Sequence, residues 1–269
     1  MMRTATAIIL ALGLVLGLAA CANGENGANE DGAAFAPNQE ATGYAYVHNG
    51  YVGRAVATTD DEGALSVEFN EAFLPHTLAE VDLEEDAWNE DNTVSYVVRG
   101  EEVRVAEHIE YNGTTYVGNT VGESVTYVEA DEDGEPVGGQ DLELTIVAHQ
   151  DTMAEYFESI QDGAFGVMTE AGGDVETVTT TSYGQVTKRG SEYWNFGPLG
   201  WQGNAEATEE FIAENGVNYD RGDLERAEEE DEDGLRKWSV ADAVTGATWS
   251  DFPDYFAVAQ LAVAQLERQ

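Results

Sequence analysis

The stretch SYVVRGEEVRVAEHIEYNGTTYVG, residues 95–118, decides the fold class. Apolar and polar residues alternate along it, and two turn signals interrupt the alternation, at Arg99-Gly100 and at Asn112-Gly113. Asn-Gly between alternating runs is the strongest short signal for a hairpin, because both residues accept the positive φ angles of a two-residue turn. The stretch therefore predicts consecutive antiparallel strands joined by tight turns.

The β signal extends on both sides of this stretch. Upstream, YVGRAVATT (51–59) and ALSVEFN (64–70) are alternating runs joined by DDEG. Downstream, the pattern of SVTYVEADEDGEPVGGQDLELTIVAH (124–149) predicts a third pair of strands. Residues 43–148 are therefore predicted to be mainly β.

The chain from 149 to 269 shows helical periodicity as well as strand signals. Thr152 and Glu155 fit a capping box, and Gly163 is a stop signal for the helix that follows. NAEATEEFIAENG (204–216) predicts a short helix with Asn204 as its cap, and ETVTTTSYGQVT (176–187) predicts a strand. The faces predicted to be buried are Met153, Tyr156, Phe157 and Ile160 in the first helix, and Phe252, Tyr255, Phe256, Ala259, Val263 and Leu266 in a last helix that starts near Pro253.

Strands first, then mixed helices and strands, indicate an α+β fold. We expect a mainly antiparallel β-sheet with a few packed helices and a C-terminal amphipathic helix. No repeat of solenoid length is present in the sequence.

The first 42 residues are predicted to lie outside this fold. TAIILALGLVLGLAA is apolar, uncharged and too short to span a membrane, so residues 1–20 read as a secretory signal peptide. LAAC, ending at Cys21, resembles a bacterial lipobox, which implies cleavage before this only cysteine and lipidation of its sulfur. Residues 21–42 are rich in Gly, Asn, Ala and acids, and read as a flexible acidic tether. The folded part is then one domain, 43–269.

Charge restricts the possible partners. The chain has 53 acidic and 11 basic residues, a formal net charge of −42. Nucleic acid is excluded as an expected partner, because phosphate contacts need clustered Lys and Arg. The dense acidic run at 223–234 is expected to be a solvated loop, with a docking patch for a basic partner or for cations as the alternative.

The sequence lacks the motifs of most common catalytic and metal sites. The four histidines, His48, His76, His108 and His149, are far apart and lack metal-ligand spacing, and no G-x-S-x-G elbow is present. We therefore predict neither catalytic residues nor a metal site. The glycine-rich GPLGWQGN (197–204) before a helix could face a phosphate or a flat ring. Three tryptophans could flank an aromatic ligand, namely Trp194, Trp201 and Trp249.

DAVTGATWS, residues 242–250, carries the one specific signal. Asp242-x-x-Thr245-Gly246-Ala247-Thr248 resembles the flavinylation motif of the FMN-binding domain family. That family includes flavin-bearing components of the sodium-pumping NADH:quinone reductase and of the Rnf complex, and surface lipoproteins of extracellular electron transfer. The resemblance is strong over 235–269 and looser upstream, through MAEYFESIQDGAFGVMT and GWQGNAEATEEFIAENGV.

The resemblance implies a covalent cofactor. In the family, a separate magnesium-dependent transferase moves FMN from FAD onto the last hydroxyl residue of the motif, here Thr248, as a phosphoester. Asp242 matches the motif's acid, Thr245 its first hydroxyl residue, and Gly246 and Ala247 its small pair. Such an acceptor must offer an oxygen nucleophile on an accessible turn. Trp249 and Trp201 are predicted to lie near the flavin.

Two functions from different classes therefore remain. The first is an exported, lipid-anchored electron carrier with one FMN, matured by a flavin transferase and reduced by a membrane reductase or another redox protein; it is expected to be a carrier rather than a stand-alone enzyme. The second is a surface lipoprotein without a cofactor that binds a solute or a cation. A structural or adhesion lipoprotein is a third, weaker alternative.

Overall fold

The computed structural model describes residues 35–269 except 99, 196 and 242. The predicted signal peptide, Cys21 and Asp242 lie outside the described residues. Within them the fold is α+β, and every strand pair is antiparallel, as predicted.

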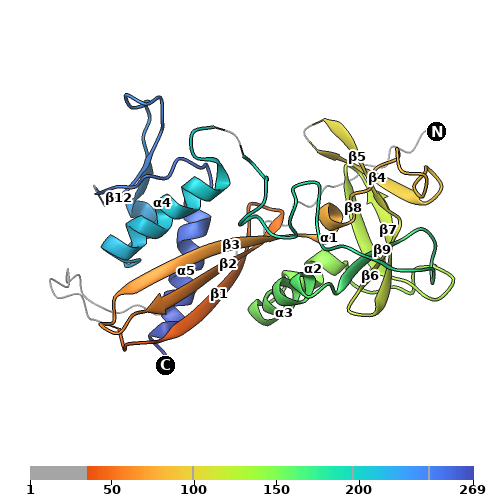
Figure 1. Ribbon diagram of the computed structural model, residues 1–269, viewed down its shortest axis with the longest axis horizontal. Helices are drawn as coiled ribbons and strands as arrows, with labels where there is room; N and C mark the ends of the chain where they lie inside the picture. The colour runs from red at the N-terminus through yellow and green to blue at the C-terminus, as the bar shows by residue number, and fades with distance from the viewer. Residues whose placement is uncertain (1–34, 99, 196, 242) are drawn as a thin grey trace, which may run out of the picture. The chain divides into compact units, whose positions relative to one another are not determined.

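A three-stranded sheet lies at the centre of the packing (Figure 1). It consists of β1 (Glu40–Val47), β2 (Tyr51–Thr59) and β3 (Leu65–Phe73), and β1 begins two residues before the predicted end of the tether at 42. Because side chains alternate between faces along a strand, this sheet serves two hydrophobic cores. On β2, Val52 enters one core while Ala55 and Ala57 enter the other.

The second sheet has the order β10-β9-β6-β7-β8. Its strands are β6 (His108–Tyr111), β7 (Thr114–Val121), β8 (Ser124–Glu129), β9 (Phe165–Met168) and β10 (Glu176–Thr177). A separate hairpin consists of β4 (Thr93–Val98) and β5 (Glu101–Ala106). The turn predicted at Asn112-Gly113 is confirmed, since it joins β6 to β7. Of the turn predicted at Arg99-Gly100, Gly100 lies between β4 and β5, whereas Arg99 is outside the described residues. The φ angles of Asn112 and Gly113, 50° and 75°, are those that a two-residue hairpin turn requires.

Five helices complete the described part of the chain. They are α1 (Pro75–Leu78), α2 (Leu142–Ile146), α3 (Gln150–Gln161), α4 (Gly200–Asn215) and α5 (Phe252–Leu266), and a 3₁₀ turn, η1, covers Arg221–Asp223. Helix α5 packs against β1 and β2, and α4 packs against β3 (Figure 1). The predicted apolar faces of α3 and α5 are confirmed, since all of their named residues are buried. These two helices thus pack where their sequence periodicity predicted.

Several predicted boundaries are wrong. Helix α3 starts at Gln150, with His149 as its cap and Thr152 bonded back to the His149 backbone, so Thr152 occupies the third helical position. Helix α4 starts at Gly200, four residues before the predicted cap Asn204.

Two predicted strands are also largely absent. The downstream half of the predicted third β pair forms helix α2, capped by the side chain of Asp141. Of the strand predicted over 176–187, Glu176–Thr177 forms the short strand β10 and Thr187 makes an isolated bridge to Ala72, while the residues between them form no strand. Thr and Val runs favour strands, but a pairing partner decides whether one forms.

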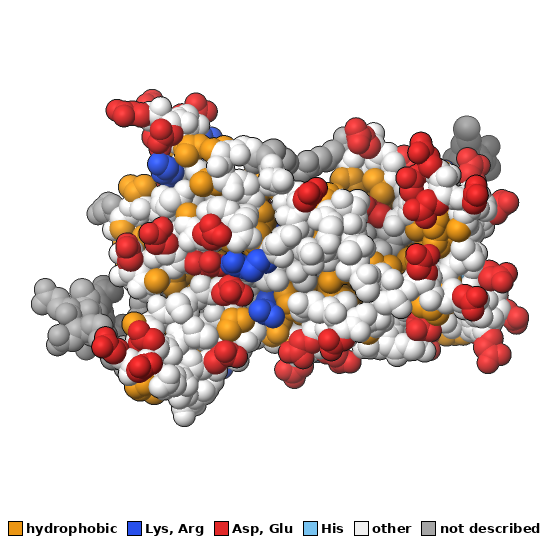
Figure 2. Space-filling model, viewed as in Figure 1, with side chains coloured by type: hydrophobic (Ala, Val, Ile, Leu, Met, Phe, Trp, Pro, Cys, Tyr) orange, Lys and Arg blue, Asp and Glu red, His pale blue; other side chains and the backbone are white. Residues whose placement is uncertain are grey.

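A third small sheet leads into α5. Its strands are β11 (Leu224–Arg226), β12 (Trp238–Val240) and β13 (Ala243–Val244), in the order β11-β12-β13. Acidic side chains are spread over the face shown in Figure 2, with few basic ones among them. Among the helices described, none is long and apolar enough to cross a membrane.

Candidate functional site

The motif residues form a tight turn between β13 and α5. We refer to Thr245–Trp249 as the motif turn. Thr245 and Ala247 are buried, and the Thr245 hydroxyl accepts a hydrogen bond from the Ala247 backbone N–H at 3.2 Å. The backbone of Trp238 on β12 brackets the turn: its N–H donates to Ala247 O at 3.0 Å, and its carbonyl accepts from Thr245 N at 2.7 Å. Thr248 is half-buried, so the hydroxyl residue of interest lies at the edge of the packed turn.

Asn204 on α4 holds the second half of the motif turn. Its Oδ1 accepts hydrogen bonds from Thr248 N at 2.6 Å, Thr248 Oγ1 at 3.1 Å and Trp249 N at 3.0 Å. Its Nδ2 donates to Gly200 O at 2.7 Å, within the same helix. Asn204 is only 1% exposed, so these contacts are shielded from water.

Arg226 on β11 contacts the motif turn at the Thr248 carbonyl. Its Nη2 donates to Thr248 O at 2.8 Å, and the Trp238 indole N–H donates to Trp249 O at 2.7 Å. Thr248 therefore donates hydrogen bonds to Asn204 from its backbone N–H and its hydroxyl, and its backbone carbonyl accepts a hydrogen bond from Arg226. A guanidinium beside Thr248 is notable in a chain with 11 basic residues.

The small residues of the motif turn allow close packing against α4. A Cβ placed on Gly246 would lie 2.8 Å from the Cβ of Ala207, which is closer than two carbon atoms can approach. This gives Gly246 a structural role in addition to the expected access for a second protein.

The side chains of two of the predicted tryptophans, Trp201 and Trp249, pack beneath the backbone of the motif turn. The Trp249 ring stacks on Tyr255 of α5, with centroids 3.5 Å apart and planes 4° apart. The Trp201 ring meets Trp249 edge-on at 6.1 Å. Trp201 and Trp249 are both 3% exposed, so their rings support the motif turn from the interior. The buried Trp249 Nε1 has no hydrogen-bond partner among the described residues.

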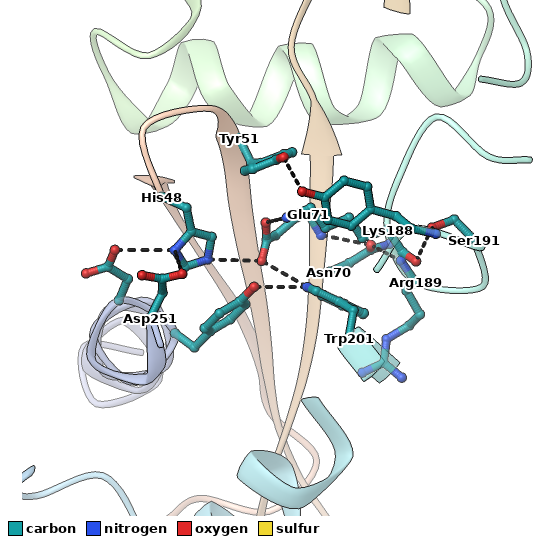
Figure 3. A network of polar contacts seen from close by, with 12 residues as sticks. His48, Tyr51, Asn70, Glu71, Lys188, Arg189, Ser191, Trp201 and Asp251 are labelled. Atoms are coloured by element: carbon teal, nitrogen blue, oxygen red, sulfur yellow. Dashed lines mark hydrogen bonds and ion pairs between the residues drawn. The ribbon is translucent and has the colours of Figure 1, made fainter. Parts of the chain in front are cut away.

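A buried polar network continues from this aromatic group (Figure 3). We define it as His48, Glu71, Lys188, Trp201 and Tyr255. The Trp201 indole N–H lies 3.2 Å from Glu71 Oε1 and 2.9 Å from the Tyr255 hydroxyl. Glu71 is fully buried and pairs with Lys188 at 2.6 Å and with His48 at 3.3 Å.

The charges of the network stabilise one another. Burial opposes ionisation of Glu71, but Lys188 and His48 outweigh it and lower the pKa of the carboxyl to about 2. Burial likewise disfavours the imidazolium of His48, yet the carboxylates of Asp254 and Glu71 raise its pKa to about 9. Burial lowers the pKa of Lys188, against the pull of Glu71. Buried charges of this kind persist only where each has partners.

An open aromatic cleft of about 700 Å³ lies next to the network. It is lined by Tyr51, His76, Thr77, Glu80, Tyr96, Val98, Glu101, Val103, Tyr183, Tyr193 and Trp194. Tyr51 and Tyr193 connect the two features, because Lys188 Nζ lies 3.2 Å and 4.4 Å from their ring centroids. Their hydroxyls are 2.5 Å apart.

The remaining histidines do not gather into one site. His76 pairs with Glu143 at 2.6 Å, and His149 caps α3. Within the described ranges, no group of His, Cys, Asp and Glu has the arrangement of a metal site.

The structure thus brings Thr245, Gly246, Ala247, Thr248, Trp249 and Trp201 together, while Asp242 and Cys21 lie outside the residues it describes. Sequence reasoning did not assign site roles to Asn204, Arg226, Glu71 or His48. Asn204 lies in GWQGNAEATEEFIAENGV, the upstream segment of the resemblance, so a signal for it was present. Glu71 is one of 53 acidic residues and carried none.

Comparison of the chain with protein-family models, with curated proteins and with solved structures gives no match.

Proposed function

We propose that this chain is an exported, lipid-anchored electron carrier that bears FMN on Thr248. The observation that carries the proposal is the state of Thr248 itself: a half-buried hydroxyl on a turn that is fixed from two sides by Asn204 and Arg226. A nucleophile must be both exposed to its reagent and held in one orientation, and this residue combines the two.

The residues around Thr248 fit a phosphoester. Arg226 supplies a permanent positive charge beside the residue, and guanidinium groups are well suited to phosphate oxygens. The motif turn is packed too tightly to change shape easily, which would keep the attachment point in place. FMN, when bound, accepts and donates one or two electrons, and the chain's task is to hold it at the surface.

The anchor and the acidic surface belong to the same proposal. Lipidation of Cys21 would keep the carrier at a membrane beside its reductase. Its net charge of −42 would favour a redox partner with a basic docking surface.

The test is covalent labelling. The full chain is co-expressed with an active flavin transferase and a known transferase substrate, run on a denaturing gel, and examined for flavin fluorescence and intact mass. We expect a fluorescent band heavier by one FMN less one water. Thr248→Ala should lose the label completely yet keep its thermal stability, because a half-exposed turn residue contributes little to folding.

Ser250→Ala is the matched control. Ser250 is an exposed hydroxyl residue two positions further on, bonded to Asp251 at 2.9 Å, and its removal should leave labelling unchanged. A wild-type chain that stays dark beside a labelled control substrate would overturn the proposal, as would a label that survives in Thr248→Ala.

The aromatic cleft favours a second candidate, a cofactor-free solute- or cation-binding lipoprotein. Its tyrosines and the acidic Glu80 and Glu101 are suited to an organic cation, since aromatic faces attract positive charge. This alternative predicts a dark band, together with a rise in melting temperature when a tetraalkylammonium salt is added and none with sodium chloride at equal ionic strength.

A further inference from the structure

The contacts of Asn204 determine where the proton of the Thr248 hydroxyl points. Thr248 N and Trp249 N are backbone donors, so the amide of Asn204 must present its oxygen to them. Its Nδ2 then faces Gly200 O, which fixes the same orientation independently. The Thr248 hydroxyl also meets this oxygen, at 3.1 Å, and must therefore donate to it.

This arrangement leaves the lone pairs of Thr248 Oγ1 unused by Asn204. A hydroxyl whose single proton is held on one side presents its lone pairs on the others. The contact with the hydroxyl is additional to the two backbone hydrogen bonds that Asn204 accepts from the motif turn. Asn204 is 1% exposed, and its side chain is held in the helix by the bond from Nδ2 to Gly200 O, while its backbone carbonyl accepts from Thr208 Oγ1 at 2.8 Å.

We propose that Asn204 is the positioning residue for FMN transfer to Thr248: it sets the rotamer and proton direction of the acceptor hydroxyl. The inference rests on the proposed carrier function and adds a residue outside the motif to the site. The proposal makes the acceptor Thr248 dependent on Asn204 of α4, which is 44 positions earlier in the sequence.

The transfer step places limits on what Asn204 can do. The Oγ–H bond of Thr248 and the pyrophosphate P–O bond of FAD break, an Oγ–P bond forms, and AMP leaves with the bridging oxygen. No oxidation state changes. The proton passes to a base of the transferase, because a neutral amide oxygen accepts a hydrogen bond but does not accept a proton. After transfer Oγ has no proton to donate, so only the two backbone bonds to Asn204 remain.

The experiment measures the rate at which the full chain gains the mass of the label. Purified chain is incubated with the transferase, Mg²⁺ and FAD, and intact mass is followed with time. Asn204→Leu and Asn204→Ala remove the acceptor oxygen; we expect labelling to slow about 10- to 100-fold, the range that misplacement of a reacting group produces. Asn204→Asp keeps an oxygen for Thr248, and its other oxygen, when protonated, can donate to Gly200 O as Nδ2 does; with the buried carboxyl protonated, we expect its rate to stay within about threefold of wild type.

Gln260→Leu is the matched control for lost stability. Gln260 on α5 is half-buried and also anchors backbone, donating to Val217 O at 2.9 Å and to Tyr219 O at 2.7 Å, and it does not contact Thr248. Its removal should lower the melting temperature by a similar amount and leave the labelling rate within about twofold of wild type.

The outcomes separate the two proposals. If wild type does not label, the carrier function fails. If wild type labels and folded Asn204→Leu or Asn204→Ala labels at the same rate, only the role of Asn204 fails. Equal slowing in Gln260→Leu, or equally slow labelling of Asn204→Asp, would also overturn that role, because lost stability or lost shape would then explain the effect.

Discussion

Two of the glycine-containing turns of this molecule are held in different ways. Asn112-Gly113 closes the hairpin of β6 and β7 with positive φ angles, and nothing lies within 4 Å of the position that a Cβ of Gly113 would take. The motif turn is held from outside, by Asn204 on α4 and by Arg226 on β11. The first conformation is encoded by its own two residues, and the second by contacts that form only when the chain has folded. Changes far from the motif turn in sequence should therefore disturb it, and the hairpin turn should be indifferent to them.

The largest stability effect is expected from Glu71, beneath the motif turn. Glu71→Gln leaves Lys188 buried without a counter-charge, and we expect a loss of about 3–5 kcal/mol in the free energy of unfolding. Urea unfolding measures it. Glu68→Gln, on the same strand but exposed, should change stability by less than about 0.5 kcal/mol. Similar losses in the two variants would contradict the ascribed role of the ion pair.

The second effect is a dependence of stability on pH. His48 faces Glu71, Asp251 and Asp254, and its pKa rises from 6.5 to about 9 in the folded chain. Because His48 binds its proton more tightly in the folded chain, its contribution to the free energy of unfolding is fully present below pH 6.5. This contribution is lost as the pH rises through 9. The total is on the order of 3 kcal/mol, from 1.36 kcal/mol per unit.

Urea unfolding between pH 6 and 10 checks this dependence. In His48→Gln the decline over this range should shrink, because the imidazole that loses its proton in this range is absent. An unchanged slope in the variant would assign the dependence to another group.

The smallest effect compares the two glycines directly. Gly246→Ala forces a Cβ to within 2.8 Å of Ala207, and we expect it to cost about 1–3 kcal/mol. The Cβ of Gly113→Ala would contact no neighbour, so we expect this variant to lose only about 1 kcal/mol of stability, because of the positive φ at this position. Thermal unfolding of both variants measures the difference.

A double-mutant cycle sharpens this comparison. Ala207→Gly in the Gly246→Ala background should recover part of the loss, with a coupling energy of about 1 kcal/mol. Additive effects would show that Gly246 is not required by its packing against α4.

The difference between the turns also explains what the sequence could predict. The hairpins and the apolar faces of α3 and α5 follow from local patterns of period 2 and 3.6, and these predictions are confirmed. The start of α4 was misplaced, because Asn204 resembles a cap while its side chain is bonded within the helix and to the motif turn. Strand signals over 142–146 failed because the side chain of Asp141 caps a helix there.

The candidate site likewise has a part that could be predicted from local sequence and a part that could not. The motif residues could be identified from their order along the chain. Their supports could not, since Arg226, Glu71 and His48 come from separate strands and turns and have no common spacing. Which of 53 acidic residues is buried depends on the position of Lys188, and one sequence does not reveal that pairing.

The packing of α5 on β1 has a consequence for the order of folding. The side chain of Gln269 donates to the backbone of Glu40, 229 positions earlier, and the helix before it covers the first two strands. Contacts of such long sequence separation form slowly, because the intervening chain must first be brought together. A ribosome-bound or translocating chain would have the central sheet uncovered until α5 emerges, with its apolar face open to chaperones. The face of the sheet that α5 covers should become buried only after synthesis has passed the motif turn, so Thr248 reaches its folded surroundings late.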